Sequence, residues 1–198
     1  MHNLGKRSVK IKTGNEYLTF TGKNLDYSLI NFWKWSVSDL LSNTSRGIFA
    51  EFIVASALNL DLSNEVRNEW SEYDLEFWEW GNIKIEVKSS SYLQTWDQSN
   101  YSNIIFSIKK RGKTSVSKQK NVFSRPSNVY VFCLLHHKDK KTVDPLNMDQ
   151  WSFYVISTKK IDELFVNKNS ISLNSLEKIT EKIKYNQLKE SILIESKK

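Results

Sequence analysis

The stretch that most constrains this chain runs from Tyr73 to Gln94, where two short apolar segments flank a turn signal. Between positions 83 and 88 apolar and charged residues alternate, which predicts a strand with one apolar and one charged face. Glu86 and Lys88 then point the same way. The segment Asp74–Trp78 predicts a second strand, and Gly81 and its neighbours predict the turn between them. The stretch therefore predicts a β-hairpin.

The register of this hairpin decides which side chains meet. A hairpin that turns about Gly81 places Asp74 opposite Lys88 and Glu76 opposite Glu86. Asp74 and Glu86 are then diagonal neighbours on one face, with Cβ atoms about 7–8 Å apart. Two carboxylates at that spacing can share one divalent cation. A change of one residue in the turn would move Asp74 to the other face, so the site hypothesis depends on the register.

A segment upstream, Arg46 to about Asn59, predicts a helix that is apolar nearly all round and hence mostly buried. Glu51 is the only acid in it. A buried carboxylate without a partner is costly, so Glu51 should meet a cation or a donor. Arg46 or another basic side chain is one candidate partner, and a metal held by Asp74 and Glu86 is the other.

The order of the remaining elements indicates the fold class. Asp26 or Ser28 could cap a helix that runs to about Leu41 and buries one apolar side. Further strands are expected at 103–109, 128–135 and 151–156, and helices at 160–165, 175–183 and 185–194. This order predicts a mixed sheet covered by helices on both sides, in one domain over residues 1–198. Its core would span about 44–160, followed by C-terminal helices over 160–195.

Composition narrows the class of protein further. The chain has 198 residues and a net charge of +7, which favours polyanionic partners. The single Cys133 excludes an intramolecular disulfide and a cysteine-rich zinc site. The first dozen residues have no apolar stretch typical of a signal peptide, and the longest apolar run, Val129–Leu135, is too short to span a bilayer. A cytoplasmic protein is expected.

Four elements of this pattern resemble the PD-(D/E)XK nuclease superfamily, which has the restriction-endonuclease-like fold. They are Glu51 within RGIFAEF, Asp74, the triplet Glu86-Val87-Lys88, and Gln94 beyond it. Tyr73 stands where the motif often has proline. The resemblance covers about residues 44–110, and it implies an α/β/α sandwich with a central mixed β-sheet flanked by helices.

The resemblance also implies a reaction, which is hydrolysis of a phosphodiester with Mg²⁺, or Mn²⁺ as its substitute, to leave a 5′-phosphate. Asp74, Glu86 and the Val87 carbonyl would bind the metal, and Glu51 would orient metal waters or hold a second metal. Lys88 would orient the attacking water or help to deprotonate it. Gln94, the last of the catalytic candidates, would position the substrate or Lys88. The implied enzyme is a DNA endonuclease of restriction or phage-defence type.

A basic segment at 109–120 is the candidate nucleic-acid-binding surface, although a solvated loop is an equal alternative. Its cations are Lys109, Lys110, Arg111, Lys113, Lys118 and Lys120. The tryptophans near the hairpin, Trp70, Trp78, Trp80 and Trp96, suit packing better than base stacking. The C-terminal helices are packing elements or a homodimer interface.

Two other classes of function stay open. One is a catalytically silent nuclease-fold module that binds nucleic acid or a partner protein. The other is an unrelated α/β interaction protein in which the charged hairpin face is only solvated. The position of the Glu51 carboxylate relative to those of Asp74 and Glu86 discriminates between a shared metal site and these alternatives.

Overall fold

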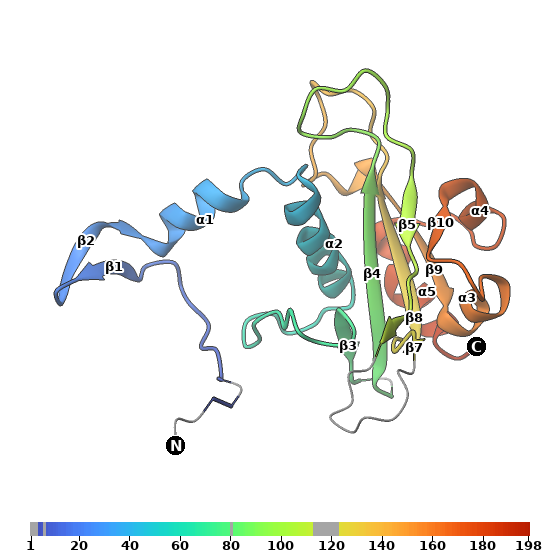
Figure 1. Ribbon diagram of the computed structural model, residues 1–198, viewed down its shortest axis with the longest axis horizontal. Helices are drawn as coiled ribbons and strands as arrows, with labels where there is room; N and C mark the ends of the chain where they lie inside the picture. Colours follow the sequence, from blue (N-terminus) through green and yellow to red (C-terminus); the bar gives the residue numbers. More distant parts are fainter. Residues whose placement is uncertain (1–3, 6, 80, 113–122) are drawn as a thin grey trace. The chain divides into compact units, whose positions relative to one another are not determined.

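The computed structural model describes residues 4–5, 7–79, 81–112 and 123–198 (Figure 1). Contacts between Cα atoms divide the chain into two compact units. The smaller unit comprises residues 1–39 and 61–69, and the larger comprises residues 40–60 and 70–198. The larger unit holds the predicted hairpin, so it is the one that positions the candidate site.

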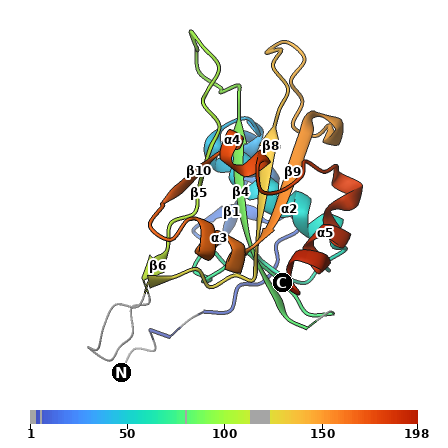
Figure 2. The ribbon, with the colours of Figure 1, turned by 90° about the vertical axis from the view of Figure 1, so that its right-hand side faces the viewer.

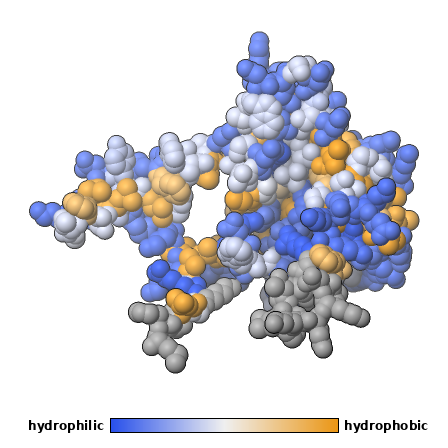
Figure 3. All heavy atoms as spheres, viewed as in Figure 1, coloured by the Kyte–Doolittle hydropathy of each residue, from blue (hydrophilic) through white to orange (hydrophobic). Residues whose placement is uncertain are grey.

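The smaller unit is a β-hairpin followed by a short helix. Strands β1 (Tyr17–Phe20) and β2 (Lys23–Ser28) pair antiparallel, and helix α1 spans Leu29–Val37. Ser28 is the N-cap, as predicted, and its backbone N–H donates to the Asn31 side chain at 2.8 Å. The prediction of a buried side was wrong, because α1 buries none of its residues. Hydrophobic side chains therefore remain on the surface of this unit (Figure 3).

The larger unit is built on a four-stranded mixed sheet in the order β3-β4-β8-β9. Its strands are β3 (Leu75–Phe77), β4 (Ile83–Ser91), β8 (Val129–Leu135) and β9 (Trp151–Ser157). β4 runs parallel to β8, and the other two pairs are antiparallel. Every residue of β8 and β9 is buried, which explains their nearly continuous apolar sequences.

One face of the sheet packs against α2 (Asn43–Ala57) and α5 (Leu188–Glu195). Ser42 caps α2 and accepts a hydrogen bond from the Ser45 N–H. From the sheet, Ile83, Ile85 and Val87 face this layer. α2 is less completely buried than predicted, since Phe52 on its outer side is exposed. A 3₁₀ turn, η2 (Tyr185–Gln187), leads into α5.

The opposite face carries a second core, so helices cover both sides of the sheet as predicted (Figures 1 and 2). Its elements are α3 (Thr158–Leu164), α4 (Leu173–Glu177), and the paired strands β5 (Ile105–Ser107) and β10 (Ser170–Ser172). Short strands β6 (Arg111–Gly112) and β7 (Phe123–Ser124) pair nearby, and η1 (Met148–Gln150) precedes β9.

Several element boundaries differ from the sequence prediction. β4 continues through Ser89–Ser91, beyond the alternation of positions 83–88 that predicted the strand, because each of the three serines pairs with a residue of the long apolar strand β8. α4 ends at Glu177 instead of continuing to position 183. Ile183 instead forms a backbone bridge with Phe153 in β9, which a helix through that position would prevent.

Candidate active site

The predicted hairpin is present, but its register is shifted by two residues. Leu75 pairs with Ile85, and Phe77 pairs with Ile83. The loop between them is five residues long, and Gly81 and Asn82 both take positive φ angles, 98° and 60°. The centre of the hairpin therefore falls at position 80 instead of 81.

The shift corrects the predicted pairing without changing the face. Continued by one residue, the observed register places Asp74 opposite Glu86 instead of Lys88. An even shift keeps each side chain on its own side of the sheet. Directly opposite residues are closer than diagonal ones, with Cβ atoms about 4.5–5.5 Å apart. The two carboxylates therefore meet more closely than the sequence predicted.

Asp74 immediately precedes β3, at the point where the pairing of β3 with β4 stops. Its backbone N–H donates to the Ile85 carbonyl at 3.0 Å. Its carboxylate Oδ2 then accepts the Val87 N–H at 2.7 Å, in place of the strand partner that β3 no longer provides. An aspartate at this position thus completes the ladder and fixes its own carboxylate beside β4.

The ammonium group of Lys88 lies among three oxygens. Nζ is 2.5 Å from Glu86 Oε1, 3.0 Å from the Val87 carbonyl oxygen and 3.4 Å from Asp74 Oδ2. The side chain of Lys88 is 24% exposed, whereas that of Glu86 is only 4% exposed. One cation therefore already touches the three groups that the sequence predicted as metal ligands.

Glu86 is the most buried member of this group. Burial raises the pKa of Glu86 above its ordinary value, and the negative charge of Asp74 adds to this rise, while Lys88 and Arg111 oppose it. Its Oε2 atom is buried and has no hydrogen-bond partner within the described part of the chain. Tyr130 lies on the neighbouring strand β8, where it pairs with Glu86. Its own burial and the negative charge of Glu86 both raise the pKa of Tyr130.

Arg111 is the fourth member of the group, and the hairpin pattern did not reveal it. Its Nη2 donates to Glu86 Oε1 at 2.8 Å and lies 4.0 Å from Asp74 Oδ1. Its Nη1 donates to the carbonyls of Ser71 and Glu72, at 3.2 and 3.3 Å. The sequence marked Arg111 only as one cation of a basic run, and nothing in its spacing pointed to the carboxylates. We call Asp74, Glu86, Lys88 and Arg111 the acid site.

Glu51 comes from a different layer. It is buried on α2, the helix that packs on the face formed by Ile85 and Val87, whereas Glu86 alternates with those residues along β4. Across the residues that the structure describes, no three His, Cys, Asp or Glu side chains form a group that could hold a metal ion. The structure brings Asp74 and Glu86 together and does not add Glu51 to them.

Gln94 lies beyond the end of β4 in a network of its own. Its side-chain Nε2 donates to the Ser91 carbonyl at 3.2 Å and to Ser102 Oγ at 3.1 Å, and its backbone N–H donates to Gln98 Oε1. These bonds join the start and the end of the loop between β4 and β5. Gln94 therefore organises this loop.

The other predicted binding residues divide into two sets. Lys109 is exposed and Lys110 is half-buried, next to Arg111. Lys113, Lys118 and Lys120 lie outside the described residues, as does Trp80. The other three tryptophans are not core residues, since all are largely exposed; these are Trp70, Trp78 and Trp96.

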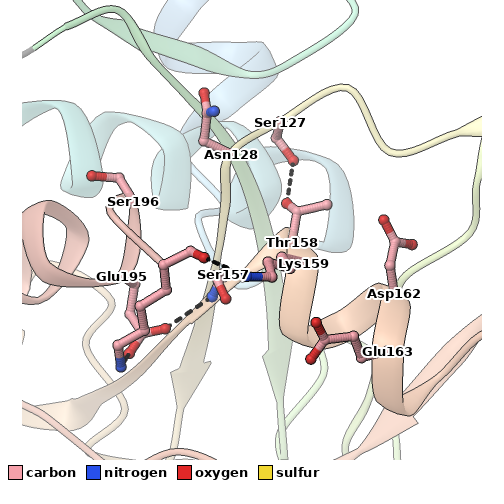
Figure 4. Close-up of a pocket in the computed structure, with 10 residues that line it drawn as sticks. Ser127, Asn128, Ser157, Thr158, Lys159, Asp162, Glu163, Glu195 and Ser196 are labelled. Carbon is pink, nitrogen blue, oxygen red and sulfur yellow. Dashed lines mark hydrogen bonds and ion pairs between the residues drawn. The ribbon is translucent and has the colours of Figure 1, made fainter.

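A separate cavity of about 540 Å³ lies at the start of α3 (Figure 4). Ser127 and Thr158 share a hydrogen bond on its wall, and Glu195 accepts the Ser157 N–H at 3.0 Å. Lys159 donates to the carbonyl of Lys198. No member of the acid site lines this cavity, and Glu195, Lys159 and Lys198 each bond to another residue of its wall.

A mixed α/β fold that gathers two acids and a lysine at a free strand edge belongs to the nuclease-like α/β class. A family model described as bacteriophage T4 endonuclease IV matches residues 22–175. The chain therefore belongs to the bacteriophage T4 endonuclease IV family, which is a family of nucleases. No curated protein matches it. In the described ranges, no helix is both long and apolar enough to cross a membrane.

Proposed function

We propose that this chain is a Mg²⁺-dependent DNA endonuclease whose acid site works as in the PD-(D/E)XK superfamily. The family supports the class of nuclease. One observation carries the finer proposal, which is the convergence of three oxygens, from Asp74, Glu86 and the Val87 backbone, on the ammonium of Lys88.

The donor set fits Mg²⁺ on two grounds. Its oxygens are two carboxylates and one backbone carbonyl, which are the hard ligands that this ion prefers. In addition, the buried Glu86 Oε2 lacks a partner within the described chain, and a cation would satisfy it. Mg²⁺ bound there would neutralise the scissile phosphate and acidify a water molecule.

The residues of the chain have distinct roles in this proposal. Asp74 and Glu86 hold the ion, and the Val87 N–H keeps the Asp74 carboxylate oriented. Lys88, released from the carboxylates, orients the attacking water and stabilises the developing negative charge. The superfamily resemblance implies that Glu51 orients metal-bound water and that Gln94 positions substrate. Because Glu51 comes from a different layer and Gln94 organises the loop after β4, neither is part of the metal site proposed here.

A cleavage assay tests the proposal. We would incubate the protein with supercoiled, linear and single-stranded DNA in Mg²⁺, Mn²⁺ or EDTA, beside Lys88→Ala. The matched control is Lys84→Ala, which removes a lysine from the same face of β4. Lys84 lies 5.1 Å from the centre of the Tyr73 ring and pairs opposite Glu76 instead of the acid site.

We expect metal-dependent cutting that Lys88→Ala reduces about 10³-fold and Lys84→Ala leaves intact. DNA binding without cutting in any metal would favour the catalytically silent module instead. Cutting that persists in EDTA, or that Lys88→Ala retains in full, would reject the proposed mechanism.

The biological setting is also a proposal. A restriction or phage-defence role follows from the resemblance to restriction enzymes, and the family description names a bacteriophage enzyme. Phage DNA and host DNA should both be tested as substrates. Homodimer formation stays a prediction, which sedimentation equilibrium of the full chain can test.

A further inference from the structure

Arg111 links three parts of the larger unit. One arm of its guanidinium binds the backbone carbonyls of Ser71 and Glu72, just before Asp74. The other arm binds Glu86 Oε1 and approaches the carboxylate of Asp74. The side chain is nevertheless 46% exposed, so the guanidinium is held by the acids and is still open to a ligand from outside.

The acid site has more cations than a metal-bound site could keep. Lys88 and Arg111 both contact the same oxygen, Glu86 Oε1. A divalent cation on that oxygen would be within a few ångströms of both positive side chains, and like charges repel strongly in a partly buried site. At least one of them must leave Glu86 when a metal ion binds.

Arg111 is the better candidate to move a long way. Lys88 is attached to β4 at the site itself, and its Nζ can stay close by turning about its own stem. Arg111 comes from β6 and is the more exposed of the two. A guanidinium also matches phosphate oxygens, because its N–H groups form a planar fork.

We propose that Arg111 is a catalytic residue that alternates between two anions. Without metal it neutralises Glu86, and in the complex with metal and nucleic acid it binds a non-bridging oxygen of the scissile phosphate. This inference rests on the proposed function. It goes beyond general contact with the nucleic-acid backbone, because it couples the metal site to the substrate through one side chain.

The test measures metal affinity without nucleic acid, so that it does not depend on activity. Mn²⁺ binding would be followed by electron paramagnetic resonance for the wild type, Arg111→Gln and Arg111→Ala. Glutamine removes the charge and shortens the side chain but keeps a polar group at this exposed position, and urea unfolding of both variants in EDTA checks that they fold. Lys109→Gln is the control, because it removes an exposed positive charge two residues away.

We expect both Arg111 variants to bind Mn²⁺ about 5- to 10-fold more tightly than the wild type, since a competing cation has been removed. Lys109→Gln should change this affinity less than 2-fold. At saturating Mn²⁺, single-turnover cleavage by the Arg111 variants should be about 100-fold slower, because the phosphate has lost a charged donor. Tighter metal binding together with slower cleavage is not expected of a purely structural arginine.

Each other result overturns the inference. Unchanged or weaker Mn²⁺ binding in both variants would show that Arg111 does not compete for Glu86. Tighter binding with full cleavage would show that Arg111 does not act on the phosphate. If the wild type neither binds Mn²⁺ nor cuts, the proposed function fails first. Metal-dependent cutting by the wild type with no effect of Arg111 rejects only this inference.

Discussion

Two charged clusters in the larger unit bury opposite members of their ion pairs. In the acid site the carboxylate of Glu86 is buried, and its cations Lys88 and Arg111 reach it from the surface. The second cluster, around Arg125, has the reverse arrangement. The Arg125 side chain is completely buried, and its partner Asp162 is 45% exposed.

The two clusters also differ in how completely their polar atoms are paired. Arg125 donates from Nε to the Ile108 carbonyl at 2.7 Å, from Nη2 to the Lys168 carbonyl, and from Nη1 to Asp162. All three of its nitrogens are thus satisfied. In the acid site, Glu86 Oε2 is left over within the described chain. A fully paired buried charge indicates a structural role, whereas the leftover carboxylate oxygen of Glu86, beside the second carboxylate of Asp74, supports the proposed metal site.

The largest expected difference between the two clusters is in the rate of cleavage. Glu86→Gln keeps the shape of the side chain but removes a proposed metal ligand, so cleavage should fall about 10³-fold or more. Asp162→Asn makes the same kind of change in the Arg125 cluster and should leave the cleavage rate within 2-fold. Initial rates on supercoiled DNA at saturating Mg²⁺ measure both. Equal losses in the two variants would mean that the clusters do not differ in function.

The next test measures the free energy of unfolding. In this test the substitution in the Arg125 cluster should have the larger effect. Arg125→Ala leaves two backbone carbonyls without donors and a void on the α3 side, which should destabilise the fold by about 2–4 kcal/mol. Arg111→Ala removes a half-exposed side chain and should change the free energy of unfolding by less than about 1 kcal/mol. Urea unfolding of each variant in EDTA gives both values. A larger loss for Arg111→Ala than for Arg125→Ala would contradict the structural assignment of Arg125.

The sequence predicted the central part of the fold because the patterns there are strong. Alternation along β4 and the apolar run of β8 each correspond to a strand, and the mixed sheet with helices on both faces is confirmed. The apolar pattern of α1 failed, because a periodic apolar side indicates burial only where the rest of the fold provides a surface to cover it. Within the smaller unit α1 is covered only in part: Trp33 lies against Gly14 and is half-buried, and no residue of the helix is fully buried.

Three members of the acid site, Asp74, Glu86 and Lys88, were predicted to lie together, but their exact pairing and the fourth member, Arg111, were missed. The alternation of residues along a strand shows which side chains share a face, so Asp74, Glu86 and Lys88 were correctly placed on one face. It does not give the centre of a five-residue loop, and the pairing was therefore two residues out. Arg111 was missed as a partner of Glu86 because it lies 25 residues further along the chain and no local pattern encodes that contact. Glu51 illustrates the same limit, because the sequence showed that it would be buried but not on which face of the sheet.

The smallest expected effect concerns the charge of Glu86. It is measured as a change in protein stability and needs no activity assay. Burial raises the pKa of Glu86 in the folded protein above its value in the unfolded chain. The folded state therefore binds this proton more readily, and its stability declines as pH rises from the unfolded pKa, about 4.3, through the folded pKa. Glu86→Gln has no charge to bury, so in EDTA at pH 7 it should melt a few degrees above the wild type. One kcal/mol corresponds to about 2–4 °C in a chain of this size.

This gain should shrink as the pH falls through about 4.3 and vanish well below it, where Glu86 is protonated in both states, and it should reverse when metal is added. Mg²⁺ that binds only the folded wild type raises the wild-type melting temperature by mass action, whereas the variant lacks a ligand and should respond less. Asp162→Asn serves as the comparison, because it leaves the acid site intact and Mg²⁺ should raise its melting temperature as much as that of the wild type. A Glu86→Gln variant that is less stable than the wild type in EDTA at pH 7 would show that Lys88 and Arg111 already compensate the buried carboxylate. The acid site would then resemble the Arg125 cluster, as a completed ion-pair network instead of a site that needs a further cation.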